Sequence, residues 1–151
     1  MSDLTTKVAV CSRSFSRNIL LRNELLSRYP NTKFNDDGHS LNGADLVDFL
    51  KGAEKAITAL EVIDEEILSQ LPDLRVIGKY GVGLDMIDLK AMRQFNVRLG
   101  WTGGVNKRSV SEMVVSLAIS LLRLIPNANN EVLNGKWRQH IGSLQIGRAS
   151  C

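Results

Sequence analysis

The chain has 151 residues, of which 44% are hydrophobic and 23% are charged, and its formal net charge is +3 at pH 7. This composition is ordinary for a soluble globular protein that can bury one good core. Lysine and arginine are spread along the chain rather than gathered in blocks, which argues against a nucleic-acid-binding surface.

The cysteines and the apolar segments indicate in which cellular compartment we expect the protein. Cys11 and Cys151 lie far apart, without the spacing of a disulfide framework or a metal site, which fits a reducing compartment. The first ten residues lack a signal-peptide pattern. The most apolar segment, residues 109–125, contains Glu112 and Arg123 and is too polar for a membrane span. We therefore expect a cytoplasmic protein with no membrane or nucleic-acid partner.

Short β-type runs alternate with helical runs over the first hundred residues. The expected strands are, in chain order, residues 7–11, 32–35, 54–60, 74–78 and 97–100. The expected helices between them are residues 16–29, 42–51, 65–71 and 89–95, the last two capped by Asp64 and Asp88. This alternation favours an α/β fold with an open, mostly parallel sheet covered on both faces.

The pattern changes after Trp101. Apolar residues from Val110 to Ile125 follow the helical period without a gap. Ser109 and Glu112 have the spacing of a capping box, so we expect the helix to begin at Ser109. Small serines on its other positions suggest burial between domains or subunits, and a plain core helix is an equally good interpretation. The Asn-rich segment after the helix is expected to bend or interrupt its path.

A glycine-containing turn follows the fourth expected strand. It runs from Lys79 to Gly83, and its glycines leave backbone N–H groups bare for a small anion such as a carboxylate or phosphate. Ligands of parallel sheets bind at this edge. Met86 occupies the third glycine position of a G-x-G-x-x-G fingerprint, so the turn does not predict dinucleotide binding. Taken alone, a plain tight turn is the better interpretation.

A second turn, Thr102 to Asn106, follows the fifth expected strand. The amide of Asn106 could orient a carbonyl or carboxamide, although a purely turn-forming Asn explains it equally well. Asp85 and Asp88 could form a carboxylate pair, but their position before a helix favours capping. Neither histidine has a partner at useful spacing, and no metal-ligand cluster or nucleophile elbow is present.

Together the two turns carry a family resemblance. Residues 71–137 resemble the D-isomer-specific 2-hydroxyacid dehydrogenases, in the phosphoglycerate-dehydrogenase-like branch. The matching segments read LPDLRVIGKYGVGLDMID, VRLGWTGGVNKRSVSEMVVSLAISLLR and NGKW. The resemblance implies a flavodoxin-like substrate domain at residues 1–100, followed at residues 101–145 by an interdomain helix and the start of a truncated Rossmann domain.

The resemblance also implies a substrate, a cofactor and a set of site residues. The substrate would be a small 2-hydroxy or 2-oxo acid, and the cofactor NAD, with NADP not excluded. The substrate carboxylate would be held through the backbone by Tyr80, Gly81, Val82 and Gly83. Asn106 and Ser109 would lie near the substrate and the nicotinamide, and the helix at residues 109–125 would form a homodimer.

The chain departs from the family in two respects. Members acting on 3-phosphoglycerate often carry an arginine after the third strand, whereas residues 58–61 read TALE, so the resemblance does not imply that substrate. The family's G-x-G-x-x-G turn and its catalytic arginine, glutamate and histidine lie beyond NGKW and are absent here. This pattern predicts an N-terminal, substrate-binding fragment that contains no catalytic residue and is inactive alone.

Two further expectations concern the last six residues of the chain and a competing class of protein. Residues 146–151, IGRASC, match the translation of a common sequencing adapter and are expected to be a non-native tail. The competing class is a stand-alone flavodoxin-like binding or dimerisation module without catalysis. A phosphate-receiver version of it is disfavoured, because the chain has Ser12-Arg13-Ser14 where an acidic pair would follow the first strand.

Overall fold

The computed structural model describes residues 4–140 of the chain. They divide into two compact units, one ending at Gly103 and the other beginning at Gly104. The tail expected at residues 146–151 lies outside the described residues, and the domain boundary expected at residue 100 stays a prediction.

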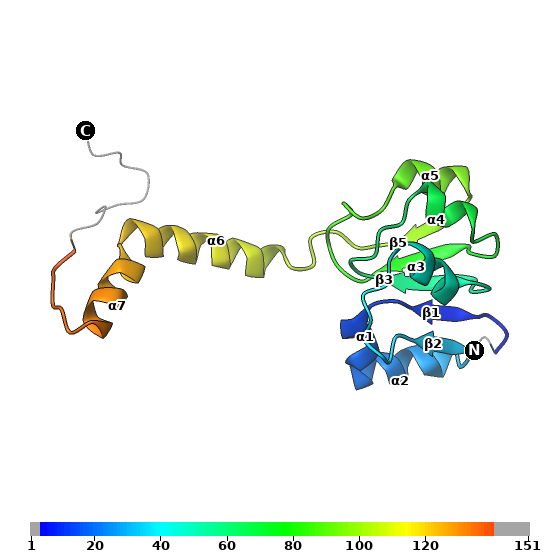
Figure 1. The fold of residues 1–151 in the computed structure, drawn as a ribbon, viewed down its shortest axis with the longest axis horizontal. Helices are drawn as coiled ribbons and strands as arrows, with labels where there is room; N and C mark the ends of the chain where they lie inside the picture. Colours follow the sequence, from blue (N-terminus) through cyan, green and yellow to red (C-terminus); the bar gives the residue numbers. More distant parts are fainter. Residues whose placement is uncertain (1–3, 141–151) are drawn as a thin grey trace. The chain divides into compact units, whose positions relative to one another are not determined.

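Five parallel strands form the sheet of the first unit (Figure 1). Their spatial order is β2-β1-β3-β4-β5. Their bounds are β1 (Val8–Val10), β2 (Thr32–Phe34), β3 (Lys55–Thr58), β4 (Val76–Lys79) and β5 (Arg98–Gly100). The expected α/β fold with an open parallel sheet is thus confirmed. Because all strands run the same way, the loops that follow them meet at one edge.

Two apolar clusters cover the sheet, one on each face. The five helices of the first unit are α1 (Arg13–Arg17), α2 (Ile19–Arg28), α3 (Gly43–Leu50), α4 (Glu65–Ser69) and α5 (Leu89–Gln94). The larger cluster takes buried side chains from α3, α4 and α5, and the smaller one joins β1 and β2 to α1 and α2. Successive strand residues point to opposite faces. Accordingly, Ala56 lies in the larger cluster and Ile57 packs against the smaller one.

The two predicted aspartate caps are confirmed. The Asp64 carboxylate accepts the Ile67 N–H at 2.9 Å at the start of α4. The Asp88 carboxylate accepts the N–H groups of Lys90 and Ala91 at 2.8 and 3.0 Å at the start of α5. Each cap fixes where a helix begins, just after a loop at the edge of the sheet.

The prediction of one helix from Ser16 onward is wrong. Ser16 belongs to the short α1, and the next helix begins only at Ile19. Asn18 between them has an extended backbone, and its side chain accepts the N–H groups of Leu20 and Leu21. A residue that caps the second helix cannot also continue the first, so the chain forms two helices.

In the second unit, the prediction that Ser109 and Glu112 form a capping box is also wrong. Helix α6 (Lys107–Leu122) begins after Asn106, which makes no side-chain cap hydrogen bond. Glu112 instead accepts a hydrogen bond from Arg108, with 2.9 Å between Nε and Oε1. The Glu112 carboxylate therefore forms an ion pair with a residue one helical turn away, instead of the capping hydrogen bond that was predicted.

A break follows α6, but it lies before the Asn-rich segment that was expected to cause it, and most of that segment is itself helical. Leu124 adopts a left-handed backbone with φ of 54°, and α7 (Ile125–Leu133) follows with Pro126 in its first turn. No single helix within residues 4–140 is long and apolar enough to cross a bilayer. Helices α6 and α7 pass that test only as a pair, and a 62° bend separates them.

Candidate functional site

The turn after β4 leaves the sheet abruptly. The Tyr80 N–H donates to the carbonyl of Thr58 at 2.7 Å and so extends the pairing of β4 with β3. Gly81 then takes φ of +139°. A Cβ atom on Gly81 would meet nothing within 4 Å, so glycine is required here for its backbone conformation rather than for space.

The peptide donors of this turn have no protein acceptor. Within the described part of the chain, the N–H groups of Gly81, Val82 and Gly83 enter no hydrogen bond. Gly81 and Gly83 are exposed and Val82 is half-buried. Bare N–H groups in an exposed turn can donate hydrogen bonds to the oxygens of a small anion. We call Gly81–Gly83 the glycine turn.

Trp101 holds the glycine turn from the neighbouring strand. It follows β5 directly, and its Nε1–H donates to the carbonyl of Val82 at 3.0 Å. Its ring also lies against Gly103, where a Cβ atom would come within 2.8 Å of the indole. Sequence reasoning missed Trp101, although its place after the fifth strand was a usable signal.

Tyr80 connects the glycine turn to α1. Its ring meets that of Phe15 edge-on, with 5.3 Å between centroids and an interplanar angle of 85°. Phe15 is buried in the smaller apolar cluster, whereas Tyr80 remains 40% exposed. The side chain thus has one anchored edge and one edge open to solvent.

A cavity of about 590 Å³ lies at the carboxyl ends of β1 and β3. Three segments line it: Ser12 with Arg13, Ser14 and Arg17 of α1, then Ser40 and Leu41 before α3, and residues 59–61 after β3. Its charged side chains are Arg13, Arg17 and Glu61. Sequence reasoning did not single out the two arginines.

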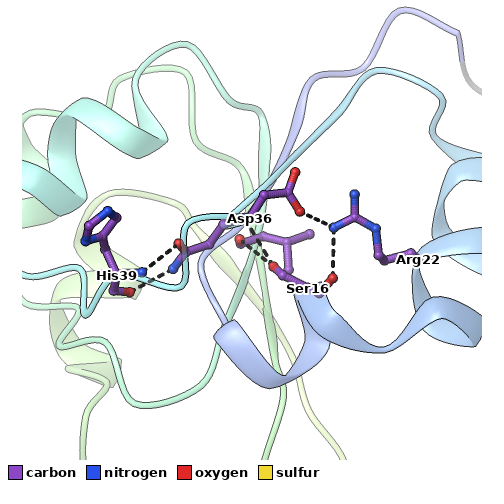
Figure 2. Close-up of polar contacts among 6 residues, drawn as sticks. Ser16, Arg22, Asp36 and His39 are labelled. Atoms are coloured by element: carbon purple, nitrogen blue, oxygen red, sulfur yellow. Dashed lines mark hydrogen bonds and ion pairs between the residues drawn. The ribbon is translucent and has the colours of Figure 1, made fainter.

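A polar network holds the loop that carries Ser40 (Figure 2). The buried Asn35 amide donates to the carbonyls of Cys11 and His39 at 2.8 and 2.9 Å and accepts the His39 N–H at 3.1 Å. Arg22 donates to the carbonyl of Ser16 at 2.8 Å and forms an ion pair with Asp36. His39 takes part through its backbone N–H and carbonyl.

The shifted titratable groups have structural explanations. Burial, and secondarily the charge of Glu61, raises the pKa of the Cys11 thiol far above its usual range, so the thiol stays protonated and is a poor nucleophile. The capping bonds from Ala91 and Lys90 lower the pKa of Asp88. Residues 4–140 contain no group of three or more His, Cys, Asp or Glu that could hold a metal ion.

The predicted site residues fall into two groups, one in each unit of the chain. Tyr80, Gly81, Val82 and Gly83 lie together at the edge of the sheet. Asn106 and Ser109 lie in the second unit, Asn106 preceding α6 and Ser109 in its first turn, and both are exposed. Their role near a nicotinamide stays a prediction.

The open parallel sheet with helices on both faces is an α/β architecture in which ligands typically bind at the carboxyl ends of the strands. The family model described as D-isomer specific 2-hydroxyacid dehydrogenase, catalytic domain, matches residues 10–141. The chain therefore belongs to the D-isomer-specific 2-hydroxyacid dehydrogenase family, as the sequence resemblance indicated.

Three of the curated relatives match over about half of the chain. It is 33% identical over 83 residues to glyoxylate/hydroxypyruvate reductase A of Arabidopsis thaliana, covering 55% of this chain and 26% of that protein. It is 39% identical over 75 residues to (S)-sulfolactate dehydrogenase of Chromohalobacter salexigens, covering 50% and 24%. D-3-phosphoglycerate dehydrogenase of Archaeoglobus fulgidus is 34% identical over 77 residues, covering 51% and 15%. The match thus spans about a quarter or less of each relative's length.

Solved structures support the fold. One is a 2-hydroxyacid dehydrogenase from Polaromonas, with a TM-score of 0.72 and 24% identity over 94% of this chain and 44% of the other. Another is D-lactate dehydrogenase from Escherichia coli, with a TM-score of 0.64 and 17% identity over 88% and 42%. At these identities the likeness concerns the fold alone.

Proposed function

We propose that this chain is the substrate-binding part of a nicotinamide-dependent oxidoreductase acting on the CH–OH group of a D-2-hydroxy acid, or on the matching 2-oxo acid. Family membership supports the reaction class. The single observation that carries the site is the set of unpaired N–H groups at Gly81, Val82 and Gly83. We place the protein in the cytoplasm, since its two cysteines suggest no disulfide framework.

The glycine turn would fix the substrate rather than transform it. Carboxylate oxygens accept hydrogen bonds from the N–H groups, and charge-assisted bonds of this kind are stronger than neutral ones. Trp101 holds the Val82 carbonyl, so the turn keeps its shape when empty. A preformed turn lowers the entropy lost on binding and sets the direction of the substrate's C2 atom.

The described residues do not form a site that fits a dinucleotide. A nicotinamide cofactor supplies hydride acceptance or donation when bound. The sequence that begins at the glycine turn has Met86 where the G-x-G-x-x-G fingerprint has its third glycine. No other segment of the sequence has this pattern. Asn106 and Ser109 remain candidates for a contact with the nicotinamide, and this part alone is proposed to be inactive.

One observation favours a second candidate, a stand-alone binding or dimerisation module. Helix α6 has no buried residue in the described part of the chain, and its large apolar side chains are exposed. An uncovered apolar face of this kind is typical of an interaction surface. In the first proposal the same helix forms a homodimer, so dimerisation alone does not separate the two.

Substrate titration separates them. Calorimetry with D-glycerate and D-lactate should show binding, and glycerol, which lacks the carboxylate, should show none. Gly81→Ala should weaken binding by about ten-fold or more, equal to about 1.4 kcal/mol, because the new side chain disfavours φ of +139°. Gly52→Ala is the matched control, since Gly52 also has positive φ, +75°, but does not belong to the glycine turn.

A turnover assay completes the test. The chain mixed with NADH and hydroxypyruvate or glyoxylate should leave the absorbance of NADH unchanged. Oxidation of NADH by the chain alone, or tight NADH binding, would contradict the proposal that the chain lacks the catalytic residues and the dinucleotide-binding turn. Failure to bind any 2-hydroxy acid would favour the module without catalysis.

A further inference from the structure

We propose that Asn42 is a site of spontaneous deamidation, at which the chain gains a carboxylate and, in part, a rearranged backbone without the help of an enzyme. This inference does not depend on the proposed function. The sequence contains two Asn-Gly pairs, Asn42-Gly43 and Asn134-Gly135. The first pair is open to the reaction in the folded chain and the second is held by hydrogen bonds, so we expect the two to differ clearly.

The reaction closes a ring between the asparagine side chain and the next peptide nitrogen. The nitrogen of Gly43 bonds to Cγ of Asn42, the Cγ–Nδ2 bond breaks, and ammonia leaves with the proton of the peptide N–H. Water then opens the ring at either carbonyl, which gives aspartate or isoaspartate. Glycine favours the first step, because it has no Cβ atom beside the attacking nitrogen and its backbone adopts many conformations.

The attacking nitrogen of Gly43 is free. Its N–H makes no hydrogen bond within residues 4–140, since Gly43 is the first residue of α3 and the N–H groups of a first helical turn have no acceptor in the helix. Asn42 and Gly43 are both exposed. A Cβ atom on Gly43 would meet nothing within 4 Å, so the space around this residue is open. The ring therefore has room to form.

The Asn42 carboxamide is held only weakly. Asn42 precedes α3, but its side chain makes no capping hydrogen bond. Among the described residues, the side chain makes one hydrogen bond, from Nδ2 to the carbonyl of Ser40 at 3.2 Å. The backbone of Asn42 is extended, with φ of −155° and ψ of 161°. The side chain can therefore turn toward the Gly43 nitrogen at the cost of a single exposed hydrogen bond.

The contacts that hold the preceding loop end before this pair. The Asn35 amide binds the N–H and the carbonyl of His39 (Figure 2). Ser40 and Leu41 follow and line the cavity at the carboxyl ends of β1 and β3. The first buried residue of α3 is Leu46. Asn42 thus lies between two fixed points, and a change in its backbone alters a segment that borders the cavity.

The second Asn-Gly pair is held at both reacting groups. The N–H of Gly135 donates to the carbonyl of Val132 at 3.0 Å, so the attacking nitrogen is engaged. The Asn134 Nδ2 donates to the carbonyl of Asn130 at 2.7 Å. The Asn134 N–H donates to the carbonyls of Asn130 and Glu131. Ring closure at Asn134 therefore requires that several hydrogen bonds open first.

Deamidation changes the charge at the start of α3. A carboxylate at residue 42 lies at the positive end of the helix dipole and can accept N–H groups of the first turn, so the aspartate product should keep α3 folded. The isoaspartate product adds a methylene group to the main chain. It should shift the amide resonances of Ser40 and Leu41, the two residues before it.

Peptide mapping of the full 151-residue chain tests the proposal. The native chain is incubated at mildly alkaline pH in water enriched in heavy oxygen, which marks each acid group formed during the incubation. It is then digested in ordinary water, and fragmentation in the mass spectrometer locates the label. Asn42 should convert about ten-fold or more faster than Asn134, because several hydrogen bonds must open at Asn134. In concentrated urea, where neither pair is held, the two rates should be similar.

A variant and the products complete the test. Asn42→Gln would have to close a larger ring, so the label should disappear from this position. Aspartate and isoaspartate forms of the Asn42 peptide have equal mass and should separate by chromatography, because water opens the ring at either carbonyl. Native rates that are equal at the two pairs, or faster at Asn134, would overturn the proposal. So would a native Asn42 that converts no faster than asparagines without a following glycine, or an aspartate product alone.

Discussion

At the scale of single residues, the candidate site depends on backbone groups and on the side chains that hold them. Gly81 supplies a conformation that other residues adopt only with strain, and Trp101 fixes the Val82 carbonyl. Neither contributes a reactive group. Under the proposed function, these residues recognise the substrate without reacting with it, and substitutions at these positions should alter affinity more than stability.

Replacing Trp101 by Phe tests whether the indole N–H holds the glycine turn in place. The variant keeps a ring but loses the Nε1–H donor to Val82, and a partly exposed hydrogen bond of this kind is worth about 1 kcal/mol or less. We expect D-glycerate affinity to fall by about three-fold to five-fold, in line with that energy. Trp137→Phe is the control, because Trp137 is 93% exposed. Equal affinities in the two variants would contradict a supporting role for Trp101.

The Thr58 hydroxyl predicts a stabilising substitution. It is fully buried at the end of β3 and has no hydrogen-bond partner within the described residues. Thr58→Val removes the unpaired group and keeps the shape. The free energy of unfolding should rise by about 1 kcal/mol or stay unchanged, because an unsatisfied buried group costs about 1–3 kcal/mol. A clear loss of stability on urea denaturation would show that the hydroxyl has a partner in solution.

Asp88 predicts a pH dependence of stability. Its pKa is lowered in the folded chain by the N–H groups of Ala91 and Lys90, so the unfolded chain takes up a proton more readily. The stabilisation is therefore full above the ordinary pKa of an aspartate and is lost as the pH falls through the lowered value. Asp88→Asn keeps an acceptor but does not titrate. The wild type should lose stability relative to this variant on acidification, and parallel urea-denaturation profiles would contradict the cap's contribution.

At the scale of elements, the sequence predicted the start of a helix correctly where the capping side chain had no competing partner. Asp64 and Asp88 each begin a helix as expected, because the capping hydrogen bonds are local. The start of α6 was misplaced because Glu112 has two possible partners, and the ion pair with Arg108 forms instead of the capping box. The break at Asn18 was missed because apolar periodicity continues across it.

Helix α6 predicts self-association. Val110, Met113, Val114, Leu117 and Leu121 share one face by their spacing, and each is at least half exposed. Burying such a face between copies is favourable by about 25 cal/mol per Å². Leu117→Glu should shift the chain toward monomer in sedimentation velocity, whereas Ser111→Glu, which adds the same charge outside this face, should not. A wild-type chain that remains monomeric at high concentration would rule out this interface.

At the scale of the whole molecule, the fold was more predictable than the site. Alternating strand and helix patterns suffice to predict a parallel α/β sheet, and the glycine turn could be predicted because it directly follows a strand. The cavity at the carboxyl ends of β1 and β3 could not be predicted from the sequence, because the three segments that line it are far apart in the chain and meet only through the strand order. The position of Trp101 after the fifth strand was a usable signal, but its bond to Val82 depends on the pairing of β4 with β5.

The most direct test of the central claim is an amide-resolved NMR titration of this chain with D-glycerate. The account predicts that the amide resonances of Gly81, Val82 and Gly83 shift together and saturate, with the Trp101 indole N–H following. Glycerol at the same concentrations should leave these four resonances unchanged. A carboxylate that leaves the amides of Gly81–Gly83 unmoved, or that shifts only resonances elsewhere in the chain, would contradict the assignment of this turn as the substrate-binding site.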